Sequence, residues 1–286
     1  MSEGINLALL PPLDVVQQVE LEAIIADIAS RAALENASPS DPAYRVALAA
    51  AYREMMLRQN ANEMCLGVML AFARGPQLDH IGVTYYRHPD GTPVTRLADE
   101  QDEAFRFRLQ HSPEGLSVAG PDGAYLFHAL SAHKDVKGAA AFGPHSLTNP
   151  TAPGFVDMYV LSRQGDGVPS NGLLTAVDAY LWPKRPMTDK FTAKAATVSH
   201  YGVVAELFMK QGPDPETVRA VAQQRAQTYV NEQHKLGGRI VESNLHWALT
   251  VEGVIEVRLI GWQDVTCQAS EAPFCDSLAV SIGGYL

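Results

Sequence analysis

The residues whose spacing first suggests chemistry lie in the glycine-rich segment 114–125, EGLSVAGPDGAY. Gly115 and Gly120 are spaced like the first two glycines of a phosphate-binding loop, in which a lysine and a serine or threonine follow the second glycine. Pro121 and Asp122 occupy those two positions here, and a proline has no N–H to donate while an aspartate repels an anion. We therefore predict no cofactor or nucleotide site in this segment.

Ser117, in the same segment, raises the alternative of a serine hydrolase, whose nucleophile lies in the motif G-x-S-x-G. The glycines that flank Ser117 are one residue too far apart for the tight turn of that motif. We instead interpret the segment as a corner, in which Gly120 and Gly123 allow the turn and Asp122 caps the following helix. Because no complete catalytic motif occurs, we predict no catalytic residues and no enzymatic activity.

Metal-binding spacings are also missing from the sequence. His128 and His133 are five residues apart, which places them on different faces of a helix, and no His-x-x-x-His pair occurs. The three cysteines (Cys65, Cys267 and Cys275) lack zinc spacing, although the last two are close enough to pair across a loop. We predict no metal site.

Four carboxylates, Asp99, Glu100, Asp102 and Glu103, fall within five positions. Acid–base chemistry or cation binding would require them to converge from different elements. We interpret them as acidic residues at the N-terminus of a helix, where the dipole favours negative charge. Asp102, or with less favourable spacing Glu103, can pair with Arg106 on the face of that helix.

A polar seam interrupts the long second helix that the periodicity predicts. The stretch RQNANEM (58–64) places Gln59 and Asn62 where the apolar stripe requires apolar residues. Such residues either mark a helix end that meets solvent or specify a partner and its register. A helix longer than a small domain is wide generally projects or crosses between bodies, which favours assembly. The candidate helical interface comprises Arg58, Gln59, Asn62, Glu63 and Leu66.

The elements that would position these residues form two groups. In the first group, a helix capped by Asp14 carries an apolar stripe from Leu21 to Ala32, and a second helix of about thirty residues runs from Asp41-Pro42 to Gly75-Pro76. A third helix is predicted over 99–111. In the second group, helices are predicted over 124–132, 173–182, 215–235 and 243–249, and strands over 136–142, 155–161, 190–198, 203–209 and 254–262.

This order predicts an α+β fold, a helical N-terminal region followed by two small α+β modules, with domains over 1–113, 114–198 and 199–286. The 286 residues are 47% apolar and 19% charged, which is typical of globular domains. The net charge of −10, with scattered basic residues, argues against nucleic-acid binding. No apolar run reaches the roughly 20 residues of a membrane span, and the N-terminus lacks the basic region of a signal peptide, so we expect cytoplasmic synthesis.

Four segments in the same order resemble the baseplate J-like family, the wedge components of contractile phage tails and R-type tailocins. They are LPPLDVV (10–16), YREMMLRQNANEMCLGVMLAFARGPQLDHIG (52–82), DEQDEAFRFRLQ (99–110) and EGLSVAGPDGAYLFHALSA (114–132), and EQHKLGGRI (232–240) agrees as well. The loop 87–97 departs from the family, so its contacts are not carried over.

The resemblance implies a structural protein without catalytic residues or cofactors. Two copies would associate with one smaller wedge protein in a 2:1 heterotrimer, and contacts with neighbouring wedges and with hub or sheath-initiator proteins would close a ring that opens on contraction. The helical first third would join the wedge core, and the later modules would make contacts around the ring. The protein would be made in the bacterial cytoplasm and end in the assembled particle. The alternatives are a cytoplasmic assembly scaffold or chaperone and the hydrolase that uses Ser117.

Overall fold

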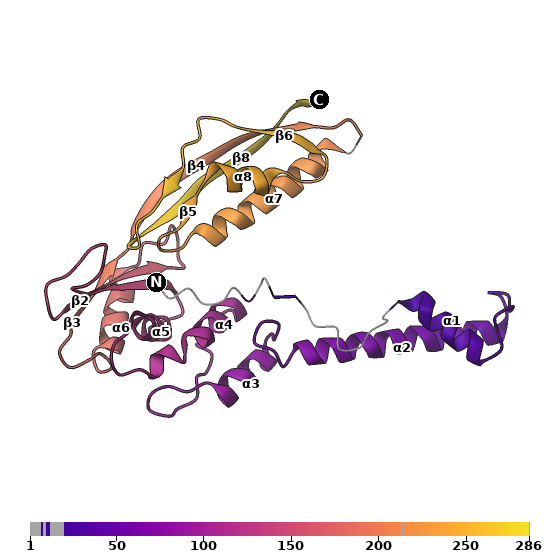
Figure 1. The fold of residues 1–286 in the computed structure, drawn as a ribbon, viewed down its shortest axis with the longest axis horizontal. Coiled ribbons are helices and arrows are strands. Elements are labelled where there is room, and N and C mark those ends of the chain that lie inside the picture. The colour runs from indigo at the N-terminus through magenta and orange to yellow at the C-terminus, as the bar shows by residue number, and fades with distance from the viewer. Residues whose placement is uncertain (1–6, 8–9, 12–19, 213, 286) are drawn as a thin grey trace.

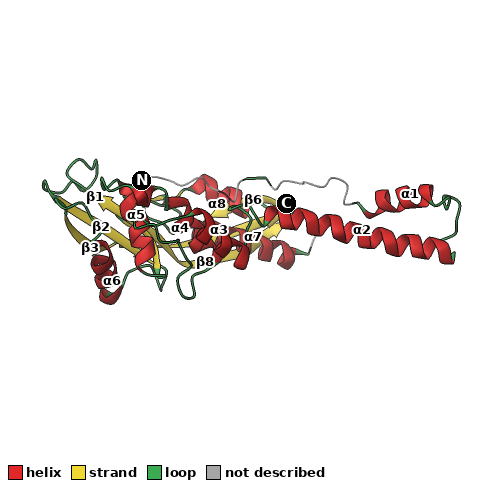
Figure 2. Ribbon diagram, turned by 90° about the horizontal axis from the view of Figure 1, so that it is seen from below, coloured by secondary structure: helices red, strands yellow, loops and turns green. Residues whose placement is uncertain are grey.

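A helical arm extends from the body of the molecule in the computed structural model, which describes residues 7, 10–11, 20–212 and 214–285 (Figures 1 and 2). The arm consists of α1 (Leu21–Arg31) and α2 (Pro42–Leu66). Asp41 caps α2 by accepting a hydrogen bond from the Ala43 N–H at 2.8 Å, and Pro42 provides a preset first residue. The two helices lie side by side and bury small and branched residues between them: Ile24, Ala29, Ala47 and Ala51. The predicted Asp14 cap lies outside the described residues.

The second helix is shorter than predicted. It ends at Leu66, and a run of turns leads to α3 (Pro76–Tyr85), which the sequence analysis did not predict as a helix. Arg106 donates to the carbonyls of Leu70 and Ala73, at 2.8 and 2.6 Å, so tertiary hydrogen bonds satisfy groups that a continuing helix would have used.

The base of the arm is a small helical core. It contains α3, α4 (Asp102–His111) and the short 3₁₀ helix η2 (Glu114–Leu116). Leu78, Phe105, Leu109 and Phe127 are fully buried in one cluster. Phe127 belongs to α5, so this core joins the base of the arm to the next module.

The middle module has three strands in the order β1-β2-β3 and two helices. Its elements are α5 (Asp122–Ala132), β1 (Val136–Phe142), β2 (Phe155–Ser162), α6 (Asn171–Leu181) and β3 (Lys190–Ala195). β1 is antiparallel to β2, and β3 is parallel to it. Met158 and Val160 of the central strand are fully buried in one cluster with Val177 of α6 and Ala129 of α5.

The C-terminal module has a three-stranded sheet in the order β6-β4-β8, with α7 and α8 packed on one face (Figure 1). Its elements are β4 (Thr197–Met209), α7 (Pro215–Gln233), β5 (Arg239–Ile240), α8 (Glu242–Leu249), β6 (Val254–Leu259), β7 (Val265–Thr266) and β8 (Glu271–Tyr285). Alternate residues of β4 from Val203 to Met209 are buried under the helices, which is the period expected for a sheet with one open face.

The prediction of an α+β fold is confirmed, with two corrections among the strands. The predicted strand 190–198 is divided at Ala196, and Val198 belongs to β4. β8, the longest strand described, was not predicted. It pairs in parallel with β4 over its whole length, and a parallel pairing depends on residues far apart in sequence.

The two modules share a core at their junction. Phe142 and Leu161 of the middle module cluster with Leu236 and Ala272 of the C-terminal module around Ala196. Asn149 Nδ2 also donates to Ser270 Oγ across the junction, at 2.8 Å. Among the described residues, no helix combines the length and the apolar character that a bilayer-spanning segment needs.

Candidate assembly surface

The outer face of α2 carries large apolar side chains that are exposed to solvent. Val46, Leu57 and Met64 are 71%, 68% and 62% exposed. They are separated by 11 and 7 residues, and at about 100° per residue these spacings place them within roughly 20° of one another around the helix. α1 packs against the opposite side, at Ala47 and Ala51. The arm therefore presents an apolar stripe to solvent, which we call the arm stripe (Val46, Leu57 and Met64).

The structure places the polar seam at the body end of α2, where Gln59 and Asn62 lie roughly 150° around the helix from the arm stripe. Gln59 and Glu63 are exposed, whereas Asn62 is buried and already interacts within the chain. Arg58 forms a helix-face ion pair with Glu54. Leu66, the last residue of α2, is half-buried.

The arm stripe was not predicted from the sequence, because its residues lie outside the main apolar stripe of the helix. The 46–57–64 spacing is a signal that was present in the sequence and that identifies a second apolar face.

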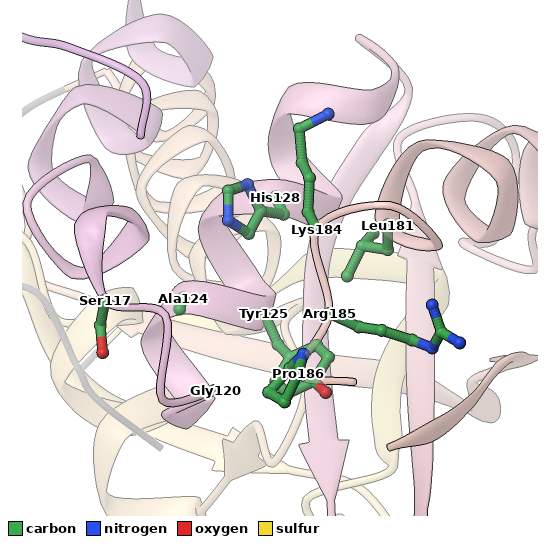
Figure 3. A pocket seen from close by; sticks show the side chains of 9 residues that line it. All are labelled: Ser117, Gly120, Ala124, Tyr125, His128, Leu181, Lys184, Arg185 and Pro186. Atoms are coloured by element: carbon green, nitrogen blue, oxygen red, sulfur yellow. The ribbon is translucent and has the colours of Figure 1, made fainter. Parts of the chain in front are cut away.

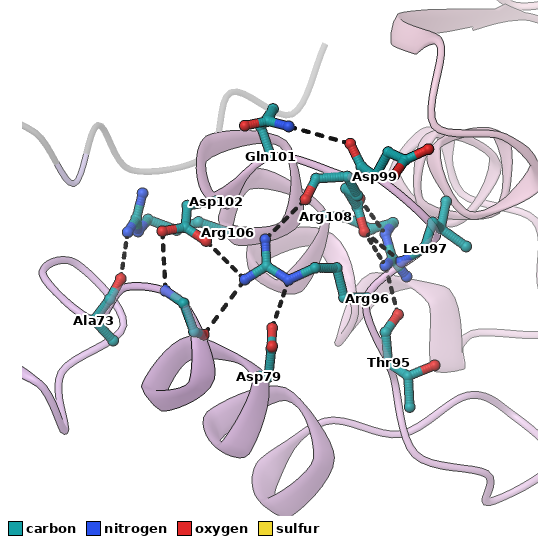
Figure 4. Close-up of polar contacts among 12 residues, drawn as sticks. Ala73, Asp79, Thr95, Arg96, Leu97, Asp99, Gln101, Asp102, Arg106 and Arg108 are labelled. Carbon is teal, nitrogen blue, oxygen red and sulfur yellow. Dashed lines mark hydrogen bonds and ion pairs between the residues drawn. The ribbon is translucent and has the colours of Figure 1, made fainter.

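Arg96 holds the base of the arm together (Figure 4). Its guanidinium contacts Asp79 of α3 at 2.6 Å and Asp102 of α4 at 2.7 Å, and it donates to the carbonyl of Glu100 at 2.9 Å. Asp102 in turn accepts from the N–H of Gly75, at 3.0 Å. Although desolvation opposes its ionisation, the hydrogen bonds from Gly75 and Arg96 lower the pKa of Asp102. The turn before α3 is therefore tied to both helices.

A buried ion pair lies next to this network. Arg108 and Glu100 are 1% and 3% exposed and form two hydrogen bonds, of 2.9 and 2.6 Å. Arg108 also donates to the carbonyl of Thr95, and Glu100 accepts from the N–H of Leu97. Fully satisfied pairs of this kind fix a unique arrangement of the loop and helix that carry them.

These contacts correct the interpretation of the four carboxylates. Asp99 and Glu100 precede α4 rather than start it, and Asp99 has a positive φ of 58°. Asp102 bonds to Gly75 and Arg96, while Arg106 donates to backbone carbonyls instead of forming the predicted pair with Asp102. Asp102 and Glu103 lie in the first turn of α4, as predicted. Asp99 instead pairs with Lys134 and Glu100 with Arg108, so tertiary contacts hold the two carboxylates that precede the helix.

The glycine-rich segment is a corner, as predicted, but its residues have different roles. Gly120 has a positive φ of 71°, so it makes the turn. Asp122 is the first residue of α5 and makes no capping bond, and Pro121 occupies the cap position. Gly123 lies inside the first turn of the helix, where a Cβ would meet the carboxylate of Glu114. Gly123 therefore permits close packing rather than the turn.

A small pocket opens beside this corner (Figure 3). Ser117 Oγ accepts a hydrogen bond from the Ala119 N–H at 3.3 Å, and no hydrogen bond joins it to a histidine in the described part of the chain. Lys184 and Arg185 also line the pocket, but their charged ends point away from it. The groups that a hydrolase or a phosphate site would need do not converge here.

Two buried histidines near the base of the arm have lowered pKa values. His128 is 5% exposed, its Nδ1 has no hydrogen-bond partner, and burial, with the nearby Lys184 charge, lowers its pKa to about 4. Both ring nitrogens of the buried His111 also lack partners, and burial lowers the pKa of this residue. Across the described residues, no group of three or more potential ligands is placed to hold a metal ion, and all three cysteines are free.

Comparison with known proteins matches two parts of this architecture to family models. The baseplate J-like N-terminal domain matches residues 39–87, which include α2 and α3. The baseplate J-like central domain matches residues 117–195, the middle module. The chain is also 36% identical to baseplate protein J of Escherichia phage P2, over 98% of each chain. This chain belongs to the baseplate J-like family. The resemblance seen in the sequence is confirmed, and the N-terminal match covers α2 of the arm and α3 of its base.

Proposed function

We propose that this baseplate J-like chain is a wedge protein of a contractile tail or tailocin, joining wedge units into a ring around the hub that opens on contraction. Family membership supports the coarser statement that it is a structural protein of a phage baseplate. It is made in the bacterial cytoplasm and resides in the baseplate of the assembled particle. We propose a structural role without catalytic residues for it, as its family membership suggests.

The arm is the observation that carries this proposal. Two helices extend away from the body and pack against each other, and α2 leaves the arm stripe exposed (Figures 1 and 2). Exposed apolar faces of this kind mark sites of protein association. Packing against helices of a second copy and of one smaller wedge protein, in a 2:1 heterotrimer, would bury the stripe in a helical bundle. The division into 1–113, 114–198 and 199–286 belongs to this proposal, with the first part in the wedge core.

The test is co-expression with the smaller wedge protein, followed by native mass spectrometry. We expect a 2:1 complex, and we expect Leu57→Glu to weaken it by at least about 30-fold, because a charge would be buried in the helical interface. Leu147→Glu is the matched control, since Leu147 is fully exposed in a loop outside the arm. The proposal fails if the unmodified chain stays monomeric beside its neighbour, or if Leu57→Glu assembles normally.

Mass spectrometry of purified particles separates this proposal from a cytoplasmic scaffold or chaperone. A wedge protein is retained in the finished particle, whereas a scaffold is absent from it.

A further inference from the structure

A surface on the middle module combines exposed rings with cations. Lys184 lies 3.7 Å from the centre of the Tyr180 ring, and the Arg185 guanidinium lies 3.7 Å from that of Trp182. We call the segment 180–190 and its neighbouring rings the cation–aromatic surface. Lys190 completes it by lying over Phe155 of β2, at 4.9 Å.

The cation–aromatic surface exposes apolar side chains, and its positive charges are not balanced by ion pairs. Met187 is 96% exposed at its centre, and Trp182 is half-exposed. In the described part of the chain, none of its three cations forms an ion pair with a carboxylate, whereas Arg96 and Arg108 at the arm base do. Exposed tryptophan, methionine and arginine are the residue types that are enriched in protein interfaces. A complementary partner must supply carboxylates together with apolar side chains.

The C-terminal module carries such a segment. Residues 242–257 contain three glutamates, Glu242, Glu252 and Glu256, and no lysine or arginine. All three glutamates are exposed, as are Trp247 of α8 and Ile255 of β6. We call this stretch the acidic segment. Arg225 of α7 stacks on Trp247 at 4.0 Å, and Arg258 forms an ion pair with Glu256 at 3.0 Å. Glu242 and Glu252 form no ion pair with a lysine or arginine in the described part of the chain, so they carry the charge that a partner would meet.

The distribution of charge along the chain agrees with this pairing. Residues 114–198 contain seven basic and seven acidic residues, whereas residues 199–286 contain six basic and ten acidic. α6 and β3, which flank the cation–aromatic surface, lie far from α8 and β6 in the fold, at the opposite end of the body (Figure 1). One chain cannot bring its own two surfaces together.

We infer that the cation–aromatic surface of one copy docks on the acidic segment of a second copy. Each copy carries both halves, so the contact is head-to-tail, and repetition of such a contact closes a ring when the rotation between copies allows it. The inference rests on the proposed function and gives the ring a defined contact between modules.

The test uses assembled particles and the dissociated protein. A zero-length carbodiimide reagent should couple Lys184 or Lys190 to a glutamate of the acidic segment in particles, and should not do so in the dissociated chain. Peptide mass spectrometry identifies the coupled residues. If the chain is present in particles and the crosslink is absent, this inference is wrong while the wedge proposal stands. If the chain is absent from particles, both fall.

Charge reversal supplies the second arm of the test. Lys184→Glu with Lys190→Glu, or Glu242→Lys with Glu252→Lys, should lower the yield of assembled baseplates at least about tenfold, because like charges then meet. All four substitutions together should restore the yield to within about threefold of the unmodified chain.

The matched control reverses Lys235 and Glu232, which are exposed and form no ion pair in the described structure, and it should assemble normally. Thermal melting of each variant must match that of the unmodified chain. A fourfold variant as defective as either pair alone would overturn the inference.

Discussion

Buried polar side chains are concentrated where the arm joins the body. Arg108 and Glu100 pair with each other and with backbone groups of the neighbouring loop. His111 and His128, by contrast, have buried ring nitrogens that make no hydrogen bond. A neutral histidine tolerates such a site better than an imidazolium, because burial penalises the charged form. An ion pair therefore stabilises this region, whereas protonation of its buried histidines would destabilise it.

His128 predicts an acid-sensitive stability. Its folded pKa of about 4 lies below the ordinary value of 6.5, so its contribution is fully present above pH 6.5 and is lost as pH falls towards 4. We expect the free energy of unfolding to decrease by up to about 3 kcal/mol over that window from this residue. Chemical denaturation across pH 7 to 4 measures the change.

His128→Gln provides the comparison for this prediction, because glutamine does not titrate. The variant should show a shallower pH dependence than the unmodified chain. Equal slopes for the two proteins would show that His128 does not stay neutral in the folded state.

Helices and strands with strong local signals were predicted well, and those determined by distant contacts were not. The Asp41-Pro42 start of α2 follows from two adjacent residues, and the structure has it. The end of α2 depends on Arg106, some forty residues later in the chain, which binds the turn carbonyls. β8 depends on its pairing with β4, and its alternating small residues give little signal. For the candidate surface, the polar seam was visible in the sequence, but burial of Asn62 and exposure of Gln59 required the fold.

Replacing Gly115 of η2 or Gly123 of α5 by alanine should have different effects on the free energy of unfolding. A Cβ on Gly115 would lie 2.0 Å from the fully buried Phe127 ring, so Gly115→Ala should lower the free energy of unfolding by about 2–3 kcal/mol. A Cβ on Gly123 would meet the end of the flexible Glu114 side chain, and alanine favours the helix, so Gly123→Ala should change stability by less than about 1 kcal/mol. Urea unfolding of both variants decides the order; a larger loss at Gly123 would contradict this packing.

At the scale of the whole molecule, we expect the arm to separate assembly from folding. Its outer face contributes little to the stability of the single chain, whereas its base is tied to α3 and α4 by Arg96 and Arg106. Substitutions along the outer face should therefore affect association, and substitutions at the base should affect the fold.

Gln59 and Asn62 test this separation within the predicted interface. Gln59→Leu alters an exposed position, so we expect less than about 0.5 kcal/mol change in the free energy of unfolding and a measurable change in association with the smaller wedge protein. Asn62→Leu removes an interaction of a buried amide and should destabilise the chain by about 1–2 kcal/mol. Denaturation and native mass spectrometry together measure both effects. Identical behaviour of the two variants would show that the seam acts as one surface.

The single residue Ala196 between β3 and β4 has a mechanical consequence. The N–H of Ala196 donates to the carbonyl of Val160 in β2, and the N–H of Thr197 donates to the carbonyl of Ser270, the residue before β8. The backbone therefore passes from one sheet to the other with no flexible linker between them. A tensile load along β3 would reach β4 directly and would be resisted in shear by its pairing with β8. The two modules would then move as one stiff lever, transmitting displacement from one end of the body to the other instead of absorbing it by stretching between them.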